Sequence, residues 1–168
     1  MNDRRIDDFR DRAQQPAVLY VDVFPFYLGP EGVEFLALNR RTDVPLPGVW
    51  QPVCGKLKAN ESIQAAFSRQ VFDKTGQRPS RLFSLDRVTT FYDSYYDAVL
   101  MVPAAAAELR SRELTLDPQL HVSARWVGLD EAIRLFEFDG QIAAVRTIAA
   151  AQASGFSKHL ELKVHDGS

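Results

Sequence analysis

The chain has 168 residues, of which 46% are apolar and 25% are charged, as expected for one globular domain with a sizeable core. Its formal net charge of -2, with lysines and arginines spread along the chain, excludes the basic stripe that a nucleic-acid polymer requires, so a phosphate-bearing partner should be small. The single Cys54 excludes an internal disulfide framework, and no apolar run is long enough to cross a bilayer. We therefore expect a cytoplasmic protein without a membrane partner.

The first third of the chain predicts a β-hairpin followed by an ordered loop. Residues 1–16 are polar and predict an arm or a short helix. Two β-rich runs, over 17–28 and 33–41, flank the turn sequence GPEG, which is typical of a hairpin. Proline-rich residues 42–48 exclude regular structure and lead into a short strand over 50–54.

The remaining elements alternate irregularly between helices and strands. A helix is expected over 62–75, with Gly76 as its C-terminal stop. One domain over 17–156 is expected to form an α/β or α+β fold, an α/β/α sandwich with a mixed sheet. The other expected segments are strands over 81–91, 95–102 and 124–127, helices over 130–136 and 141–153, and a loose tail over 157–168.

Polar residues gather on one face of the predicted helix. Arg69, Gln70, Asp73 and Lys74 are spaced by one, three or four positions, so they project close together, and Glu61 precedes the helix. In the simplest interpretation this is an ordinary amphipathic helix whose polar residues are solvated. Its buried face would then consist of Ile63, Ala66, Phe67 and Val71.

The spacing of these residues resembles the Nudix box. Gly55 is followed after five residues by Glu61, after seven more by Arg69, and then by Asp73 and Gly76 in the expected order. The preceding stretch LALNRRTDVPLPGVWQPVCGKL is similar to the bacterial nucleoside and dihydroneopterin triphosphate pyrophosphohydrolases of that superfamily. The later ARWVGLDEA is similar to a late strand and helix of the same fold, so the resemblance spans roughly residues 17–148.

The resemblance implies a Nudix fold and the hydrolysis of a nucleoside diphosphate linked to another group, such as a nucleoside or pterin triphosphate. It also implies Mg²⁺ or Mn²⁺, because divalent cations neutralise the phosphates and orient the attacking water. In this interpretation Glu61 and Asp73 hold the metal directly or through water. Arg69 braces the two carboxylates through charge-assisted hydrogen bonds, and Gln70 orients water.

The chain departs from the box at two metal-ligand positions. Gln70 stands where the family has the first Glu after the Arg, and Lys74 replaces the second Glu of the later pair. An ammonium about 4 Å from a divalent ion, at an effective dielectric near 20, would cost about 8 kcal/mol. Lys74 must therefore swing away, or the metal is not bound there. Since Mg²⁺ often uses one or two carboxylates plus substrate phosphates, weak activity through Glu61 and Asp73 remains an open alternative.

Four basic residues are candidates for phosphate contact. The resemblance implies that Arg40 or Arg41, before the proline-rich loop, grips phosphate, whereas the alternative is a solvated pair. Lys56 lies in the loop before the helix and Lys74 on the helix itself. Both are interpreted as substrate-binding candidates, with an ordinary surface lysine as the alternative for Lys56.

Further candidates come from the segment FYDSYYDAV. Many family members have a Glu just before the position of His121, where this chain has Leu120, so Asp93 or Asp97 is a candidate replacement carboxylate. Three tyrosines of the segment either stack on a base or simply pack, namely Tyr92, Tyr95 and Tyr96.

The loss of two carboxylates also leaves open a second function. The same scaffold without hydrolysis would be a nucleotide-binding, anion-binding or partner-binding module. In that case Lys74, Lys56 and Arg69 would hold the anionic ligand. Family members often dimerise, which makes a homodimer a further expectation that no sequence feature proves.

Overall fold

The computed structural model describes residues 17–164. The predicted arm over 1–16 therefore lies outside the described residues. No helix within 17–164 is long and apolar enough to cross a membrane. The elements are β1 (Tyr20–Gly29), β2 (Gly32–Arg40), β3 (Trp50–Gln51), β4 (Val53–Lys56), α2 (Ile63–Thr75), β5 (Arg81–Asp93), β6 (Ala98–Glu108), β7 (His121–Val127), α3 (Leu129–Leu135), α4 (Asp139–Ser154), the 3-10 helix η1 (Lys158–Leu160) and β8 (Glu161–Leu162).

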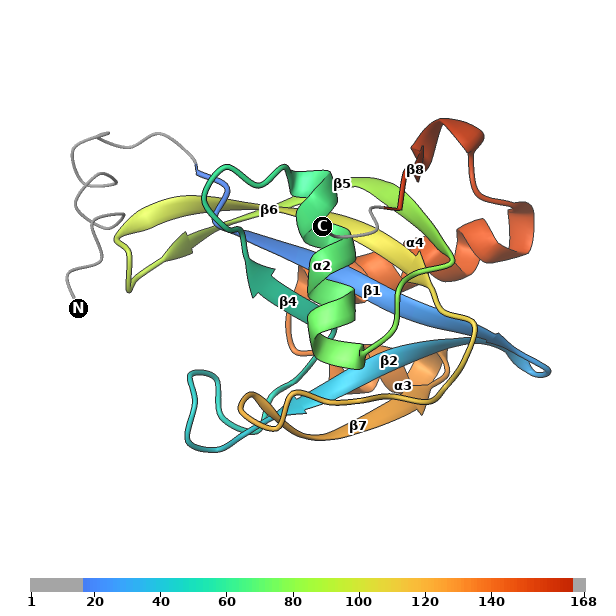
Figure 1. Cartoon of the computed structure of the whole chain (residues 1–168), viewed down its shortest axis with the longest axis horizontal. Coiled ribbons are helices and arrows are strands. Elements are labelled where there is room, and N and C mark those ends of the chain that lie inside the picture. The colour runs from blue at the N-terminus through green and yellow to red at the C-terminus, as the bar shows by residue number, and fades with distance from the viewer. Residues whose placement is uncertain (1–16, 165–168) are drawn as a thin grey trace.

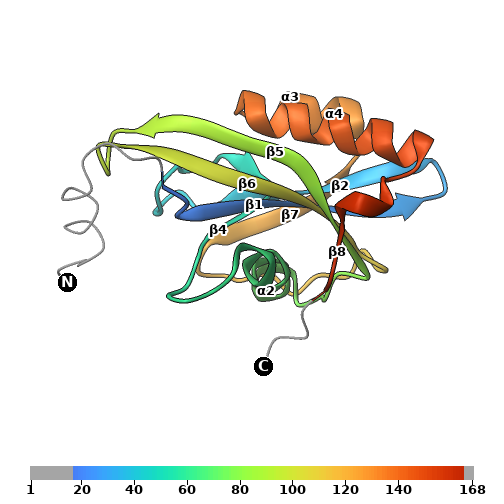
Figure 2. The same cartoon turned by 90° about the horizontal axis from the view of Figure 1, so that it is seen from above.

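The strands form one sheet with helices on both faces. Its order is β3-β2-β1-β6-β5-β8, with β4 paired to β1 and β7 paired to β2. The β1–β6 pairing is parallel and the other pairings between strands are antiparallel, so the sheet is mixed. Helix α2 covers one face, and α3 and α4 cover the other (Figures 1 and 2). The predicted α/β/α sandwich with a mixed sheet is confirmed.

Strand β1 contributes to two separate hydrophobic cores because its side chains alternate between the faces. Val21 and Val23 pack in the core beneath α2, whereas Phe24 and Phe26 pack in the core beneath α3 and α4. The run Ala104–Ala107 of β6 is divided in the same way between the two cores. Central strands that are covered on both faces are expected to be apolar throughout.

Helix α2 begins and ends where its sequence predicts. The hydroxyl of Ser62 accepts a hydrogen bond from the amide of Ala65 at 3.1 Å, which caps the N-terminus. At the other end Gly76 adopts φ 73°, and its amide donates to the carbonyl of Phe72 at 2.8 Å. A left-handed residue at this position favours glycine, which explains why the helix stops there.

Residues 157–164 of the expected loose tail over 157–168 lie against the sheet and include η1 and β8, whereas residues 165–168 lie outside the described residues. Phe156 stacks on Phe83 with ring centroids 4.1 Å apart, and β8 then pairs with β5 through Leu82 and Leu162. An apolar anchor followed by strand pairing holds this part of the chain against the sheet. This pairing was not predicted, because a strand of only two residues has almost no periodic pattern.

Candidate functional site

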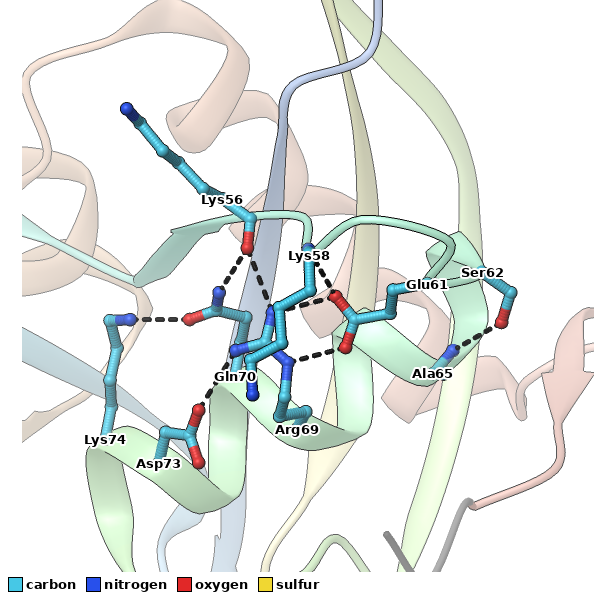
Figure 3. A network of polar contacts seen from close by, with 9 residues as sticks. All are labelled: Lys56, Lys58, Glu61, Ser62, Ala65, Arg69, Gln70, Asp73 and Lys74. Atoms are coloured by element: carbon cyan, nitrogen blue, oxygen red, sulfur yellow. Dashed lines mark hydrogen bonds and ion pairs between the residues drawn. The ribbon is translucent and has the colours of Figure 1, made fainter. Parts of the chain in front are cut away.

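Arg69 is the centre of a network that joins α2 to the loop before it (Figure 3). Its Nε donates to Glu61 Oε1 at 2.5 Å and its Nη2 to Glu61 Oε2 at 2.9 Å, while Nη1 donates to Asp73 Oδ2 at 3.0 Å. Nη2 also donates to the carbonyl of Lys56 at 2.9 Å. The amide of Lys58 gives Glu61 a further hydrogen bond at 2.8 Å. We call this the Arg69 network.

The Arg69 network favours the charged form of Glu61. Glu61 is mostly buried, and its hydrogen bonds from Arg69 lower the pKa of its carboxyl group below the ordinary value. Asp73 is more open, with 47% of its side chain exposed. The sequence predicted that Arg69 braces these two carboxylates, and the structure brings all three together.

A second network lies beside the first and faces the protein interior. Lys74 Nζ donates to Gln70 Oε1 at 2.5 Å, and Gln70 Nε2 donates to the carbonyl of Lys56 at 2.8 Å (Figure 3). Only 7% of Lys74 and 4% of Gln70 are exposed, and burial lowers the pKa of the Lys74 ammonium. We call this the Lys74–Gln70 pair. Lys74 therefore turns inward and does not swing out to solvent.

Gly55 makes room for the Lys74–Gln70 pair. A Cβ atom at this position would lie 2.0 Å from Gln70 Oε1, which is far inside van der Waals contact. The glycine of the box thus allows the amide of Gln70 to lie directly against strand β4. A larger residue would displace Gln70 and, with it, the partner of Lys74.

The residues present do not fit a divalent ion held on α2. No group of three or more His, Cys, Asp or Glu side chains able to hold a metal occurs within residues 17–164. Both oxygens of Glu61 accept hydrogen bonds from Arg69, and Gln70 Oε1 accepts from the Lys74 ammonium. The carboxylates Glu61 and Asp73 remain, but a neighbouring ammonium occupies the position of a third ligand.

The predicted phosphate-binding residues separate into different environments. Arg41 forms an exposed ion pair with Asp43 at 2.7 Å, so the interpretation of Arg41 as a surface residue fits its surroundings. Arg40 donates from Nε to the carbonyl of Pro45 at 2.6 Å and lies opposite His121 on β7. Lys56 points away from α2, and its ammonium lies 5.8 and 5.7 Å from the ring centroids of two tyrosines, Tyr20 and Tyr96.

The segment between β5 and β6 does not complete a metal site. Asp93 Oδ1 accepts hydrogen bonds from the amides of Tyr95 and Tyr96, which closes the turn, and Asp97 accepts one from the hydroxyl of Tyr92. Tyr96 is buried against Tyr20 and Lys56, so it packs, as one of the two alternatives predicted. The side chains of Tyr92 and Tyr95 are exposed.

A buried polar cluster behind the Lys74–Gln70 pair had no predicted role. Gln51 and His121 face each other with Nε2 atoms 3.5 Å apart, and Gln141 contacts Cys54 Sγ at 3.9 Å. Within residues 17–164, His121 Nδ1 and Gln141 Oε1 have no hydrogen-bond partner although both side chains are buried. Buried polar atoms normally have partners, so these two mark a place where a ligand or water would bond.

Electrostatics link this cluster to the basic residues of the site. Burial, with Lys74 and Arg40 nearby, lowers the pKa of His121 to about 4, so its imidazole is neutral at pH 7. Burial raises the pKa of Asp22 to about 6, although a hydrogen bond with Cys54 acts in the opposite direction and lowers it. The Cys54 thiol has a pKa raised by burial, in agreement with the inert role expected for it. The sequence signal that could have indicated this buried polar cluster was a charged or polar residue within an apolar strand, such as Asp22.

The comparisons with known proteins agree on one family. Residues 19–147 match the model of the NUDIX domain. A NUDIX hydrolase structure from Listeria monocytogenes has a TM-score of 0.72 at 23% identity, covering 83% of this chain and 96% of that one. The NUDIX domain of Shewanella oneidensis NrtR, in complex with ADP ribose, has a TM-score of 0.65 at 17% identity, covering 87% and 97%.

A third similar structure is the dihydroneopterin triphosphate pyrophosphohydrolase of E. coli, with a TM-score of 0.66 at 18% identity, covering 82% of this chain and 97% of that one. At these identities the structural likenesses show the fold alone. No curated protein matches the chain.

Proposed function

The chain belongs to the NUDIX family, and on this premise we propose that it binds a small nucleotide-like phosphate compound without a divalent metal on helix α2. The family generally uses divalent metals. In this chain the Lys74 ammonium takes over part of the positive charge that a metal would bring to the phosphates. The protein is then a ligand-binding NUDIX domain.

The observation that carries this proposal is the inward position of Lys74. Lys74 is 7% exposed and its ammonium is bonded to Gln70 Oε1 at 2.5 Å, so a divalent ion at the same carboxamide would meet strong repulsion. Arg40 and Lys74 both act on His121, which means that two cations lie near the unpartnered His121 Nδ1. An anionic ligand with polar ring atoms suits these surroundings.

The compounds bound or hydrolysed by similar proteins suggest the ligand class. NrtR was crystallised with ADP ribose, and the E. coli structure is of a dihydroneopterin triphosphate pyrophosphohydrolase. Both compounds combine a phosphate chain with a heterocyclic ring. We therefore propose ADP ribose and nucleoside triphosphates as the first compounds to test.

Isothermal titration calorimetry with the full chain tests this function. ADP ribose is titrated once in EDTA and once in Mg²⁺, and we expect the same dissociation constant in both. Lys58→Met is the matched control for Lys74→Met, because it removes a loop lysine while the backbone hydrogen bond from residue 58 to Glu61 remains. Binding that requires Mg²⁺ would contradict the proposal, as would the absence of binding by every nucleotide and pterin phosphate tested.

A pyrophosphohydrolase dependent on Mg²⁺ or Mn²⁺ is the second candidate. The Arg69 network favours it, because Glu61 and Asp73 keep the arrangement that the family resemblance implies. In this case nucleotides incubated with either ion release phosphate or pyrophosphate, and both Glu61→Gln and Asp73→Asn abolish the release. Equal background release from all three proteins would remove this candidate.

A further inference from the structure

A cavity of about 390 Å³ lies between the first turns of α2, the irregular part of β5 and strand β8. We call it the bulge cavity. Gln64 of α2 lines it and donates from Nε2 to the carbonyl of Lys163 at 3.0 Å, which ties α2 to the segment that follows β8. The lining residues belong neither to the Arg69 network nor to the Lys74–Gln70 pair. The bulge cavity is therefore separate from the candidate functional site, and its volume is that of a small-molecule site.

The walls of the bulge cavity are apolar and partly open to solvent. Ile63 of α2 and Val88 of β5 both line it, and they are 37% and 47% exposed. The other large apolar residues of the lining are Phe67, Pro103 and Leu162. A ligand that covered these walls would remove apolar surface from water, which is favourable. The cavity therefore suits a molecule with an apolar group.

A bulge in β5 shapes the polar side of the cavity. Between the pairs Ser84–Ala105 and Val88–Pro103, β5 advances four residues while β6 advances only two. Asp86 lies within this bulge at φ 50°, in the left-handed region, and its amide donates to Ser84 Oγ at 3.3 Å. Bulges bend a strand and often direct a side chain towards a functional site.

The bulge brings Arg87 to the same cavity as Asp86. In a regular strand successive side chains point to opposite faces, so Arg87 would share the face of Leu85. Leu85 packs in the core beneath α3 and α4, yet Arg87 and Asp86 both line the bulge cavity beside α2. Within residues 17–164 neither the Asp86 carboxylate nor the Arg87 guanidinium has a hydrogen-bond or ion-pair partner. Two opposite charges at adjacent positions are thus available to a ligand.

We propose that the bulge cavity binds a free α-amino acid with an apolar side chain. The α-carboxylate pairs with Arg87, the α-ammonium pairs with Asp86, and the side chain lies between Ile63 and Val88. A zwitterion satisfies both charges, whereas a simple apolar carboxylate would leave Asp86 unpaired next to a second negative charge. The proposal does not depend on nucleotide binding, because the cavity shares no residue with either polar network.

Nuclear magnetic resonance of the isotope-labelled full chain, titrated with L-leucine, tests the ligand class. We expect saturable shifts of the backbone amides of Asp86, Arg87 and Val88. Three analogues that each lack one recognised group should bind at least about tenfold more weakly. They are isocaproate without the ammonium, isoamylamine without the carboxylate, and glycine without the side chain. No saturable shift with leucine, or an analogue that binds as tightly as leucine, would overturn the proposal.

Two substitutions remove the charges of the bulge cavity one at a time. Arg87→Gln and Asp86→Asn should each weaken leucine binding at least about tenfold, as for loss of one charge-assisted interaction. Asparagine tolerates the left-handed conformation, so Asp86→Asn should leave the bulge intact.

The matched control is Arg110→Gln, at an exposed arginine outside the cavity, which should change the dissociation constant less than about threefold. Equal weakening by Arg87→Gln and Arg110→Gln, or leucine binding that neither cavity variant affects, would contradict the proposed contacts.

Discussion

Helix α2 carries two polar networks whose environments differ sharply. The Arg69 network faces the loop and joins a half-exposed Asp73 to Glu61 through one guanidinium. The Lys74–Gln70 pair begins one residue further along the helix but is almost completely buried. The first network keeps the carboxylates implied by the family resemblance, whereas the second replaces two of them by an amide and an ammonium.

The proposed function assigns different roles to the two networks. An arginine that bridges two carboxylates stabilises the helix and loop whether or not a metal is bound. A buried ammonium at a carboxylate position, by contrast, makes the site less favourable for a cation and more favourable for an anion. Under the proposed function, the Lys74–Gln70 pair rather than the Arg69 network decides which chemistry the site supports.

Lys74→Met should have the largest effect on ligand binding. The substitution removes the buried charge with little change in volume, so ADP ribose binding in EDTA should weaken by about 10- to 100-fold, as for loss of one charge-assisted interaction. Calorimetry measures the change. The free energy of unfolding should change by less than about 1.5 kcal/mol, because an apolar residue suits a buried position. Unchanged binding would show that Lys74 is structural only.

Gly55→Ala should disturb the Lys74–Gln70 pair from strand β4. The added Cβ meets the Gln70 carboxamide at 2.0 Å, so we expect a loss of about 1–3 kcal/mol in the free energy of unfolding, measured by urea titration. Gly128→Ala is the control, because a Cβ there would meet no atom within 4 Å, and it should change stability by less than about 0.5 kcal/mol. Equal losses would mean that the close packing of Gln70 against β4 is unimportant.

The pH dependence of stability tests how burial shifts the pKa values of His121 and Asp22, which lie behind the Lys74–Gln70 pair. His121, with a pKa lowered to about 4 from 6.5, makes stability fall as pH falls from 6.5 towards 4. Asp22, with a pKa raised to about 6 from 3.8, makes stability fall as pH rises from 3.8 towards 6. The two effects oppose each other, so the wild type should show a shallow dependence between pH 4 and 6.

Single variants separate these opposing contributions. In the same pH range His121→Gln should leave stability falling as pH rises, and Asp22→Asn should leave it rising, each with a slope of up to about 1.4 kcal/mol per pH unit. Urea titrations at several pH values measure both slopes. Identical slopes in the two variants would contradict the buried environment of these residues.

The smallest effect is expected for Arg41→Gln, outside both networks. Its ion pair with Asp43 is exposed, so the free energy of unfolding should change by less than about 0.5 kcal/mol and ligand binding should not change. Arg40→Gln is the informative comparison. Because Arg40 lies opposite His121, this substitution should weaken ligand binding. If Arg41→Gln were the more damaging variant, the phosphates would bind at the proline-rich loop instead.

The helix and its surroundings could be predicted because local signals agreed. Spacing, the turn before the helix and Gly76 together located α2, and the box positions brought Arg69, Glu61 and Asp73 together as expected. The burial of Lys74 and Gln70 was not predictable from periodicity, which assigned the buried face to apolar residues. Ile63, expected to be buried, is 37% exposed. Tertiary contacts with Gly55 and the carbonyl of Lys56 override the amphipathic pattern.

The alanine-rich segment after Pro103 illustrates a different reason why sequence analysis was incomplete. Alanine favours helices in isolation, yet Ala104–Ala107 form a central strand that is buried by helices on both faces. Small side chains suit a strand that pairs with β1 and β5 between two packed layers. Likewise, the buried polar cluster joins residues from separate elements, so only the fold brings Gln51, His121 and Gln141 near one another.

The central claim is that Lys74 replaces a metal on helix α2, and titration with Mn²⁺ tests it most directly. Electron paramagnetic resonance measures free Mn²⁺, and in the absence of nucleotide it should show no wild-type site that depends on Asp73. Asp73→Asn should therefore leave Mn²⁺ binding unchanged. The double variant Gln70→Glu, Lys74→Glu should gain one such site. A wild-type Mn²⁺ site that is lost in Asp73→Asn and unaffected by Lys74→Met would contradict the account.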